Sequence, residues 1–183
     1  MSSARTPAPR RQTSLWSRLD AASRYSFPSG MLVFGLFLIG LPLGLPGQAE
    51  MRPVYVMACV FFWSLYRPAS LPAPLVVLAG LLLDLTGLSP LGLWAVLLLG
   101  LQGVVLASRR RLIPRNFWMS WGIFLTLATL FAGLDWAAQS ALTLTLLPLR
   151  PVLAQAILAA ILYPALAGFF IRAHRGAAAV ELA

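Results

Sequence analysis

The chain has no lysine, one cysteine, one histidine and only five carboxylates among its 183 residues. A single cysteine excludes an internal disulfide, and Cys59, inside an apolar run, is predicted to be a small core residue. The sequence offers no metal-ligand cluster, no phosphate-binding loop and no nucleophile with a base beside it. The histidine, His174, lies between Arg172 and Arg175 and is predicted to sit at a membrane edge. We therefore expect no catalytic residue, no metal and no cofactor, and predict that the protein is not an enzyme.

Hydrophobic residues dominate what remains. They make up 60% of the chain, charged residues make up 10%, and a mean hydropathy of +0.83 is too high for a soluble domain. A membrane-spanning helix needs about 20 apolar residues, so six spans use roughly 120 and leave no room for a soluble catalytic domain. The apolar segments are Phe27–Leu45, Pro53–Tyr66, Leu71–Leu85, Leu88–Ala107, Phe117–Leu134 and Val152–Ile171. The predicted fold class is an all-α membrane protein with six transmembrane helices.

The arginines fix the orientation of these segments. If the first residue is cytoplasmic, only Arg52 and Arg150 of the fourteen arginines fall outside. The twelve inside are Arg5, Arg10, Arg11, Arg18, Arg24, Arg67, Arg109, Arg110, Arg111, Arg115, Arg172 and Arg175. Because cationic loops translocate poorly, both termini are predicted to be cytoplasmic. We attribute the net charge of +9 to contact with anionic lipid headgroups, worth about 1 kcal/mol per arginine, rather than to a nucleic acid. The cluster from Arg109 to Arg115 is the strongest marker of this membrane surface.

Three regions follow from this pattern. Residues 1–26 are predicted to be a disordered basic tail, in which 14–25 form either an interfacial helix or a merely solvated segment. Residues 27–175 are the six-helix transmembrane domain, and 176–183 are a short cytoplasmic tail.

Some segments depart from a regular span. Pro53–Tyr66 has 14 residues and as a helix covers only about 21 Å, and Leu71–Leu85 is also short. Either both cross a locally thinned bilayer, or they form a re-entrant hairpin buried in protein. Pro164 is expected to kink the sixth helix or free one carbonyl. Ala137–Pro148, after the fifth segment, is expected to form an outer amphipathic loop.

Two carboxylates, Asp84 and Asp135, lie in apolar segments, where an ionised carboxylate costs about 2.5–3.5 kcal/mol at mid-membrane. Asp135 is expected at the outer interface in contact with solvent. Asp84 either ends its helix in a buried polar turn or contacts a ligand or partner. Their depths differ by about a helical turn, which argues against a protease dyad that shares a proton. Arg67 either extends to the inner headgroups or pairs with another group in the bundle.

One stretch resembles a known family. The second segment ends in Trp63-x-x-x-Arg67-Pro68, the third contains Gly80-Leu-Leu-Leu-Asp84, and Leu-Thr-Gly-Leu-Ser-Pro90-Leu-Gly92 follows. Together these residues are similar to MreD, the rod shape-determining protein of the bacterial inner membrane, most specifically over 61–95. The resemblance implies a multi-pass inner-membrane protein of the elongation (rod) complex, which binds the single-span protein MreC. It also implies action beside the filament protein MreB and the RodA/class B penicillin-binding protein pair in lateral peptidoglycan synthesis.

The resemblance also suggests roles for these residues. It implies that Asp84 and Arg67 help to hold the second and third segments, which would together offer a groove to the spanning helix of a partner. The family fold is similar to the substrate-binding subunits of energy-coupling-factor vitamin transporters, so the alternative function is a small-molecule-binding subunit of a transporter. Such a subunit needs an outer pocket, for which the sequence offers Gln48, Glu50, Asp84, Trp94, Asp135, Trp136 and Gln139.

Overall fold

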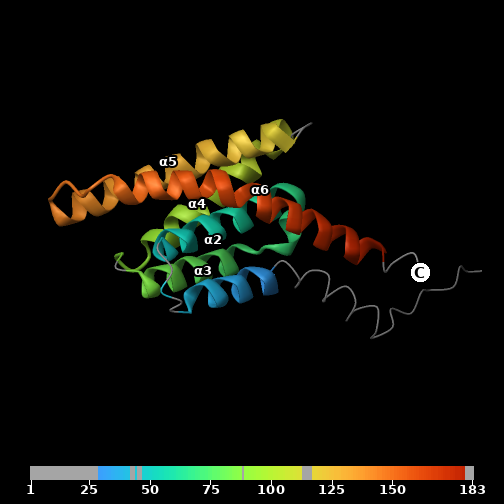
Figure 1. Cartoon of the computed structure of the whole chain (residues 1–183), viewed down its shortest axis with the longest axis horizontal. Coiled ribbons are helices and arrows are strands. Elements are labelled where there is room, and N and C mark those ends of the chain that lie inside the picture. Colours follow the sequence, from blue (N-terminus) through green and yellow to red (C-terminus); the bar gives the residue numbers. More distant parts are fainter. Residues whose placement is uncertain (1–28, 42–43, 45–46, 88, 113–116, 180–183) are drawn as a thin grey trace, which may run out of the picture.

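The computed structural model describes residues 29–41, 44, 47–87, 89–112 and 117–179. The predicted tail and interfacial helix lie outside this range. Over the described residues the chain is all-helical and has no strand, which confirms the all-α part of the predicted fold class. The helices are Ser29–Gly40, α2 (Gln48–Tyr66), the short 3-10 helix η1 (Pro68–Ser70), α3 (Ala73–Thr86), α4 (Leu93–Leu112), α5 (Phe117–Thr143) and α6 (Arg150–Ala179). They lie side by side as one bundle (Figure 1).

Helix α2 lies in the centre of the bundle. It packs against α3, α4, α5 and α6, and every residue from Pro53 to Leu65 is buried. A helix that is apolar on all sides is one whose sides are all covered, which explains the lack of a polar face in this segment. Three rings tie it to α5 and α6: Phe61 lies 5.4 Å from Phe124, and Phe124 stacks on Tyr163 at 4.4 Å. From Pro53 to Leu65, α2 presents no open face, so this part of α2 does not line the groove suggested between the second and third segments.

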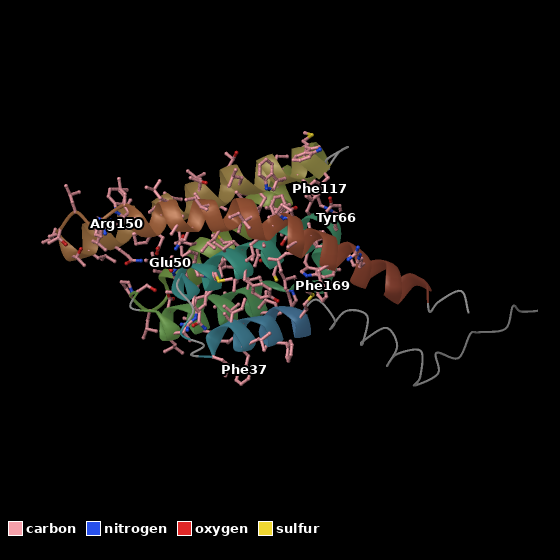
Figure 2. All side chains as sticks on the ribbon, viewed as in Figure 1. Phe37, Glu50, Tyr66, Phe117, Arg150 and Phe169 are labelled. Carbon is pink, nitrogen blue, oxygen red and sulfur yellow. The ribbon has the colours of Figure 1, made fainter. Side chains whose placement is uncertain are left out.

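Among the described residues, two helices are long and apolar enough to cross a membrane by length and composition. They are Phe117–Thr143, with a mean hydropathy of 1.6, and Arg150–Phe169 of α6, with 2.0. The outward faces of the bundle carry many exposed apolar side chains. Phe34 and Phe37 on the first helix are 66% and 68% exposed, and Figure 2 shows Phe37 pointing away from the bundle. So wide an apolar surface needs either an apolar protein partner or an apolar surrounding such as lipid.

Two arginine hydrogen bonds mark the two ends of α2. At one end Arg52 of α2 donates a hydrogen bond to the carbonyl oxygen of Thr86 at the end of α3, at 3.0 Å. At the other end Arg109 of α4 donates to the carbonyl oxygen of Leu65, at 2.8 Å. We call these the carboxylate end, which holds Glu50, Asp84 and Asp135, and the Arg109 end. In Figure 2 the labels Glu50 and Tyr66 mark the two ends of α2. The turn between α2 and α3 therefore lies at the Arg109 end, opposite the carboxylate end.

Several boundaries differ from the sequence prediction. Helix α2 begins at Gln48 and has 19 residues, about 28 Å, because Pro53 lies within it rather than before it. Helix α3 has 14 residues and is short, as predicted. Helix α5 continues to Thr143, so the outer loop predicted from Ala137 is wrong over its first half. The helical spacing persists there, since Gln139 bonds back to Asp135 one turn earlier.

Pro164 acts within α6 as the sequence predicts. A proline has no N–H, so the carbonyl of Ala160 one turn earlier has no helical donor. The indole nitrogen of Trp121 on α5 donates a hydrogen bond to that carbonyl oxygen at 3.0 Å. The freed carbonyl thus becomes a joint between α5 and α6.

Candidate functional site

The connection between α3 and α4 is built around the carboxylate of Asp84, whose side chain is only 3% exposed. One carboxylate oxygen accepts the hydroxyl of Ser89 at 3.2 Å and the backbone N–H of Trp94 at 3.2 Å. The other accepts the backbone N–H of Gly92 at 2.8 Å. Trp94 lies in the first turn of α4, and Gly92 immediately precedes the helix. The N–H groups at the start of a helix have no acceptor within the helix, and a negative charge there is favourable. Asp84 therefore caps the following helix, a structural role in a buried turn.

Two glycines from the MreD-like stretch serve the same connection. A Cβ atom on Gly80 would lie 2.8 Å from the carbonyl carbon of Trp94 and 2.5 Å from the backbone nitrogen of Ala95. Only a hydrogen fits there, so α3 and α4 are in backbone contact at this point. Gly92 has a φ of 95°, in the region that favours glycine. The carbonyl of Pro90 accepts the N–H of Leu93 at 3.2 Å and completes the turn.

The remaining predicted residues lie at the Arg109 end. Trp63 is 1% exposed within α2 and packs edge-on against Phe62 at 5.3 Å. Arg67 follows α2 and is half-buried, and Pro68 begins η1. Arg67 and Asp84 thus lie at opposite ends of the bundle, and no hydrogen bond or ion pair joins the Arg67 side chain to another described residue.

Arg109 has a second role besides that of a surface charge. It is half-buried, and its bond to Leu65 caps the end of α2, where the last carbonyls of a helix attract a cation. Arg110 and Arg111 lie in the last turn of α4, and their side chains are outside the described residues. Arg115 and the side chain of His174 are also outside them.

Arg52 is a structural residue that the sequence reasoning missed, because it was assigned only to an outer loop. Besides Thr86, its guanidinium donates to the carbonyl oxygens of Ile39 at 3.4 Å and Gly40 at 3.3 Å. Both Ser29–Gly40 and α3 end at these carbonyls, so one guanidinium caps two helices. Gln48 also donates to the carbonyls of Ile39, at 2.8 Å, and Leu41.

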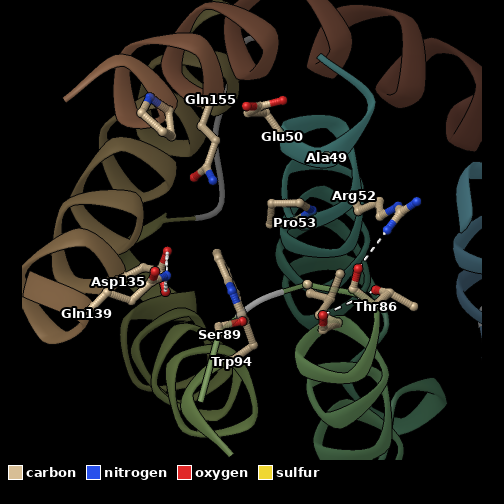
Figure 3. A pocket seen from close by; sticks show the side chains of 13 residues that line it. Ala49, Glu50, Arg52, Pro53, Thr86, Ser89, Trp94, Asp135, Gln139 and Gln155 are labelled. Atoms are coloured by element: carbon tan, nitrogen blue, oxygen red, sulfur yellow. Dashed lines mark hydrogen bonds between the residues drawn. The ribbon is translucent and has the colours of Figure 1, made fainter. Parts of the chain in front are cut away.

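A cavity of about 410 Å³ opens at the carboxylate end between α2, the α3–α4 turn, α5 and α6 (Figure 3). Four of its residues belong to the outer polar set named for a transporter subunit: Glu50, Trp94, Asp135 and Gln139. Its lining is Ala49, Glu50, Arg52, Pro53, Leu83, Thr86, Gly87, Ser89, Trp94, Asp135, Gln139, Pro151 and Gln155. Asp84 is absent from the lining and reaches the cavity only through its bonds to Ser89 and Trp94.

Asp135 corrects an expectation. It was predicted to be solvated at the interface, yet its side chain is only 7% exposed, because α5 continues past it and α6 packs alongside. The side-chain amide of Gln139 donates to its two carboxylate oxygens at 2.9 Å each. Each oxygen keeps a further lone pair for another donor.

Gln155 of α6 also faces this cavity and was not recognised as a site residue. It is 9% exposed, and its carbonyl oxygen Oε1 has no hydrogen-bond partner among the described residues. In Figure 3 its amide extends from α6 into the space between Asp135 and Pro53. A polar side chain one turn into an otherwise apolar helix is the signal that marks it. Pro53 has no N–H, so the backbone carbonyl of Ala49 on the cavity wall lacks a helical donor as well.

Two acceptors of the cavity wall keep capacity for a further donor. The three bonds of Arg52 go to helix carbonyls, while the carboxylate of Asp135 and the oxygen of Gln155 keep acceptor capacity. No group of three or more His, Cys, Asp or Glu residues that could hold a metal ion is found within the described part of the chain. Comparison with protein-family models, curated proteins and solved structures gives no match to this chain.

Proposed function

We propose that the chain is a six-span protein of the bacterial inner membrane, with the Arg109 end in the cytoplasm and the carboxylate end outside. The placement of twelve of fourteen arginines supports this orientation. The exposed apolar faces support contact with lipid, and the end-to-end course of the α2–α3 hairpin supports two crossings rather than a re-entrant loop.

The topology can be tested with single cysteines in a Cys59→Ala background. Ala49, near the start of α2, and Ala69, in the turn after it, are both exposed. A membrane-impermeant maleimide added to intact cells should label a cysteine at position 49. It should label one at position 69 only after the inner membrane is permeabilised. Labelling of both positions from outside would contradict the six-span proposal.

For the function, we propose a non-enzymatic component of the elongation complex, similar to MreD. It binds MreC and helps to couple MreB filaments to RodA and its class B penicillin-binding protein in lateral peptidoglycan synthesis. The observation that carries this proposal is that the MreD-like residues of α3 and the turn after it act as one unit. Gly80 lets the two helices touch, and Asp84 and Gly92 fix the start of α4. Residues that act in this way hold a surface in one shape for a partner helix.

Helix α3 offers the best such surface. Because it covers only about 21 Å, it is shorter than the hydrocarbon core, and this mismatch favours packing against another helix over exposure to lipid. Its outward side chains Leu78, Leu82 and Leu85 are 56%, 41% and 67% exposed. We therefore assign this face to the single spanning helix of MreC.

The proposal is tested by depleting the protein in its bacterial host and following cell shape, with and without rich nutrient supplementation. Loss of elongated form that supplements do not restore is the expected result. Replacement of Leu82 by Trp should weaken recovery of MreC in pull-downs. The matched variant Leu130→Trp changes a similarly exposed residue on α5 and should leave recovery intact. Normal shape after full depletion would overturn the proposal.

The second candidate is a small-molecule-binding subunit of a membrane transporter, which the cavity at the carboxylate end favours. On this alternative the bundle would be similar to the substrate-binding subunits of energy-coupling-factor transporters. Its signature would be normal shape with a growth defect cured by one nutrient.

A further inference from the structure

The cavity at the carboxylate end has no part in the binding of MreC through α3. Its walls nevertheless come from five helices, α2 to α6, and carry an arrangement of polar groups that packing alone does not require. A buried acceptor without a donor lowers stability, so such a group is retained at a cost unless something else bonds to it. Gln155 is that group, because its Oε1 is buried and unpartnered among the described residues.

The partner that Gln155 lacks must be a hydrogen-bond donor. The nearby wall groups repeat this demand: the carboxylate of Asp135 receives only Gln139 among the described residues, and the carbonyl of Ala49 has lost its helical donor to Pro53. Two acidic residues, Glu50 and Asp135, and one basic residue, Arg52, line the cavity, so its wall carries more acidic than basic groups. Among the described lining residues no second cation offsets this excess of acidic groups, and the N–H groups of Arg52 already donate to the carbonyls that end two helices.

We infer that this cavity binds a primary ammonium group, held by the carboxylate of Asp135 and the amide oxygen of Gln155. An ammonium carries three N–H donors and one positive charge, which match several convergent acceptors and the excess of acidic groups in the wall. Trp94, which is 5% exposed and lines the same cavity, supplies an aromatic ring that attracts a cation. The volume of about 410 Å³ admits a small amine or a lipid headgroup.

Two kinds of molecule could bring a primary ammonium group to a cavity on the outer side of the inner membrane. One is a free organic amine, and the other is the headgroup of phosphatidylethanolamine. The experiment therefore uses the full chain in nanodiscs of phosphatidylglycerol alone, titrated with 2-phenylethylamine or ethanolamine by calorimetry. The matched neutral probe is 2-phenylethanol and the matched anion is phenylacetate. A second arm compares retention of phosphatidylethanolamine and phosphatidylglycerol on the purified protein by native mass spectrometry.

The variants are Asp135→Asn and Gln155→Met. Each keeps the size of the side chain, and Gln155→Met strands no partner because the oxygen it removes has none. The control is Gln102→Met, a buried glutamine that donates to the carbonyl of Leu71 at 2.9 Å and does not line the cavity. Each cavity variant should weaken amine binding, or phosphatidylethanolamine retention, at least tenfold, whereas the control should leave both within twofold of the unmodified protein.

The outcomes separate the sources and the inference itself. Binding of a free amine identifies a soluble ligand, and selective retention of phosphatidylethanolamine identifies a headgroup; both support an ammonium site. The inference would be overturned if the protein neither binds a free amine nor retains phosphatidylethanolamine selectively. Equal binding of 2-phenylethanol and the amine would also overturn it. Unchanged binding in folded Gln155→Met and Asp135→Asn proteins would also overturn it. None of these results depends on whether the chain binds MreC.

Discussion

Replacement of Asp84 tests the account of the α3–α4 connection most sharply. In Asp84→Ala three donors lose their acceptor: the hydroxyl of Ser89 and the backbone N–H groups of Gly92 and Trp94. The N–H of Trp94 is buried, so water does not replace the bond, and an unsatisfied buried donor costs about 1–3 kcal/mol. Loss of the other two bonds, which are partly buried, costs about 1 kcal/mol together. The expected destabilisation is therefore about 3 kcal/mol for Asp84→Ala. For Asp84→Asn, which keeps one oxygen, about 1.5 kcal/mol is expected.

The assay is thermal unfolding of the purified protein in one detergent, followed by fluorescence. For a chain of this size about 3 kcal/mol corresponds to a fall in the unfolding midpoint of roughly 6–12 °C, with the Asn variant in between. Thr86→Ala is the matched control, since the exposed side chain of Thr86 bonds only to the carbonyl of Leu83 among the described residues, and it should change stability by less than about 0.5 kcal/mol. If both Asp84 variants have the same unfolding midpoint as Thr86→Ala, the carboxylate does not cap α4 and the reasoning fails.

Two further predictions concern packing. Gly80→Ala should destabilise the bundle by about 2 kcal/mol or more, because the new methyl group meets the backbone of α4. The control Gly103→Ala, whose Cβ meets nothing within 4 Å, should be neutral or slightly stabilising. Equal unfolding midpoints for the two variants would refute the close approach of α3 and α4. Trp121→Phe should cost about 1 kcal/mol for the lost bond to Ala160. Because Pro164→Ala restores a helical donor to Ala160, the Trp121→Phe change should cost less in that background, and additive effects in a double-mutant cycle would argue against the joint.

The sequence predicted the helical class and the turn chemistry well, because these depend on local residue types. Pro164 predicted a freed carbonyl, and Ala160 is that carbonyl, although its donor, Trp121, comes from another helix and could not be read from the chain. Asp84 was left open between a turn and a contact role, since a carboxylate near a polar turn fits both. The hydrogen bonds that Asp84 accepts from Gly92 and Trp94 favour the structural role in the turn.

Depth and burial were harder to predict. Asp135 was placed in solvent because its distance along a helix was counted as depth, whereas its exposure depends on how far α5 continues and on the packing of α6. The helix start at Gln48 was missed because the predicted segment followed the apolar run from Pro53, and the polar residues Gln48, Glu50 and Arg52 precede that run. Arg52 was counted as a loop charge, since its three carbonyl partners come together only in the folded bundle.

The most direct test of the central claim is recovery of MreC with the tagged chain from membranes solubilised in mild detergent, for the unmodified protein and for Leu82→Trp and Leu130→Trp. The account predicts that MreC is recovered with the unmodified chain and with Leu130→Trp. With Leu82→Trp, recovery of MreC should be strongly reduced, although the protein inserts into the membrane and has an unchanged unfolding midpoint. No recovery of MreC with the unmodified chain, after in-cell crosslinking as well, would contradict the account.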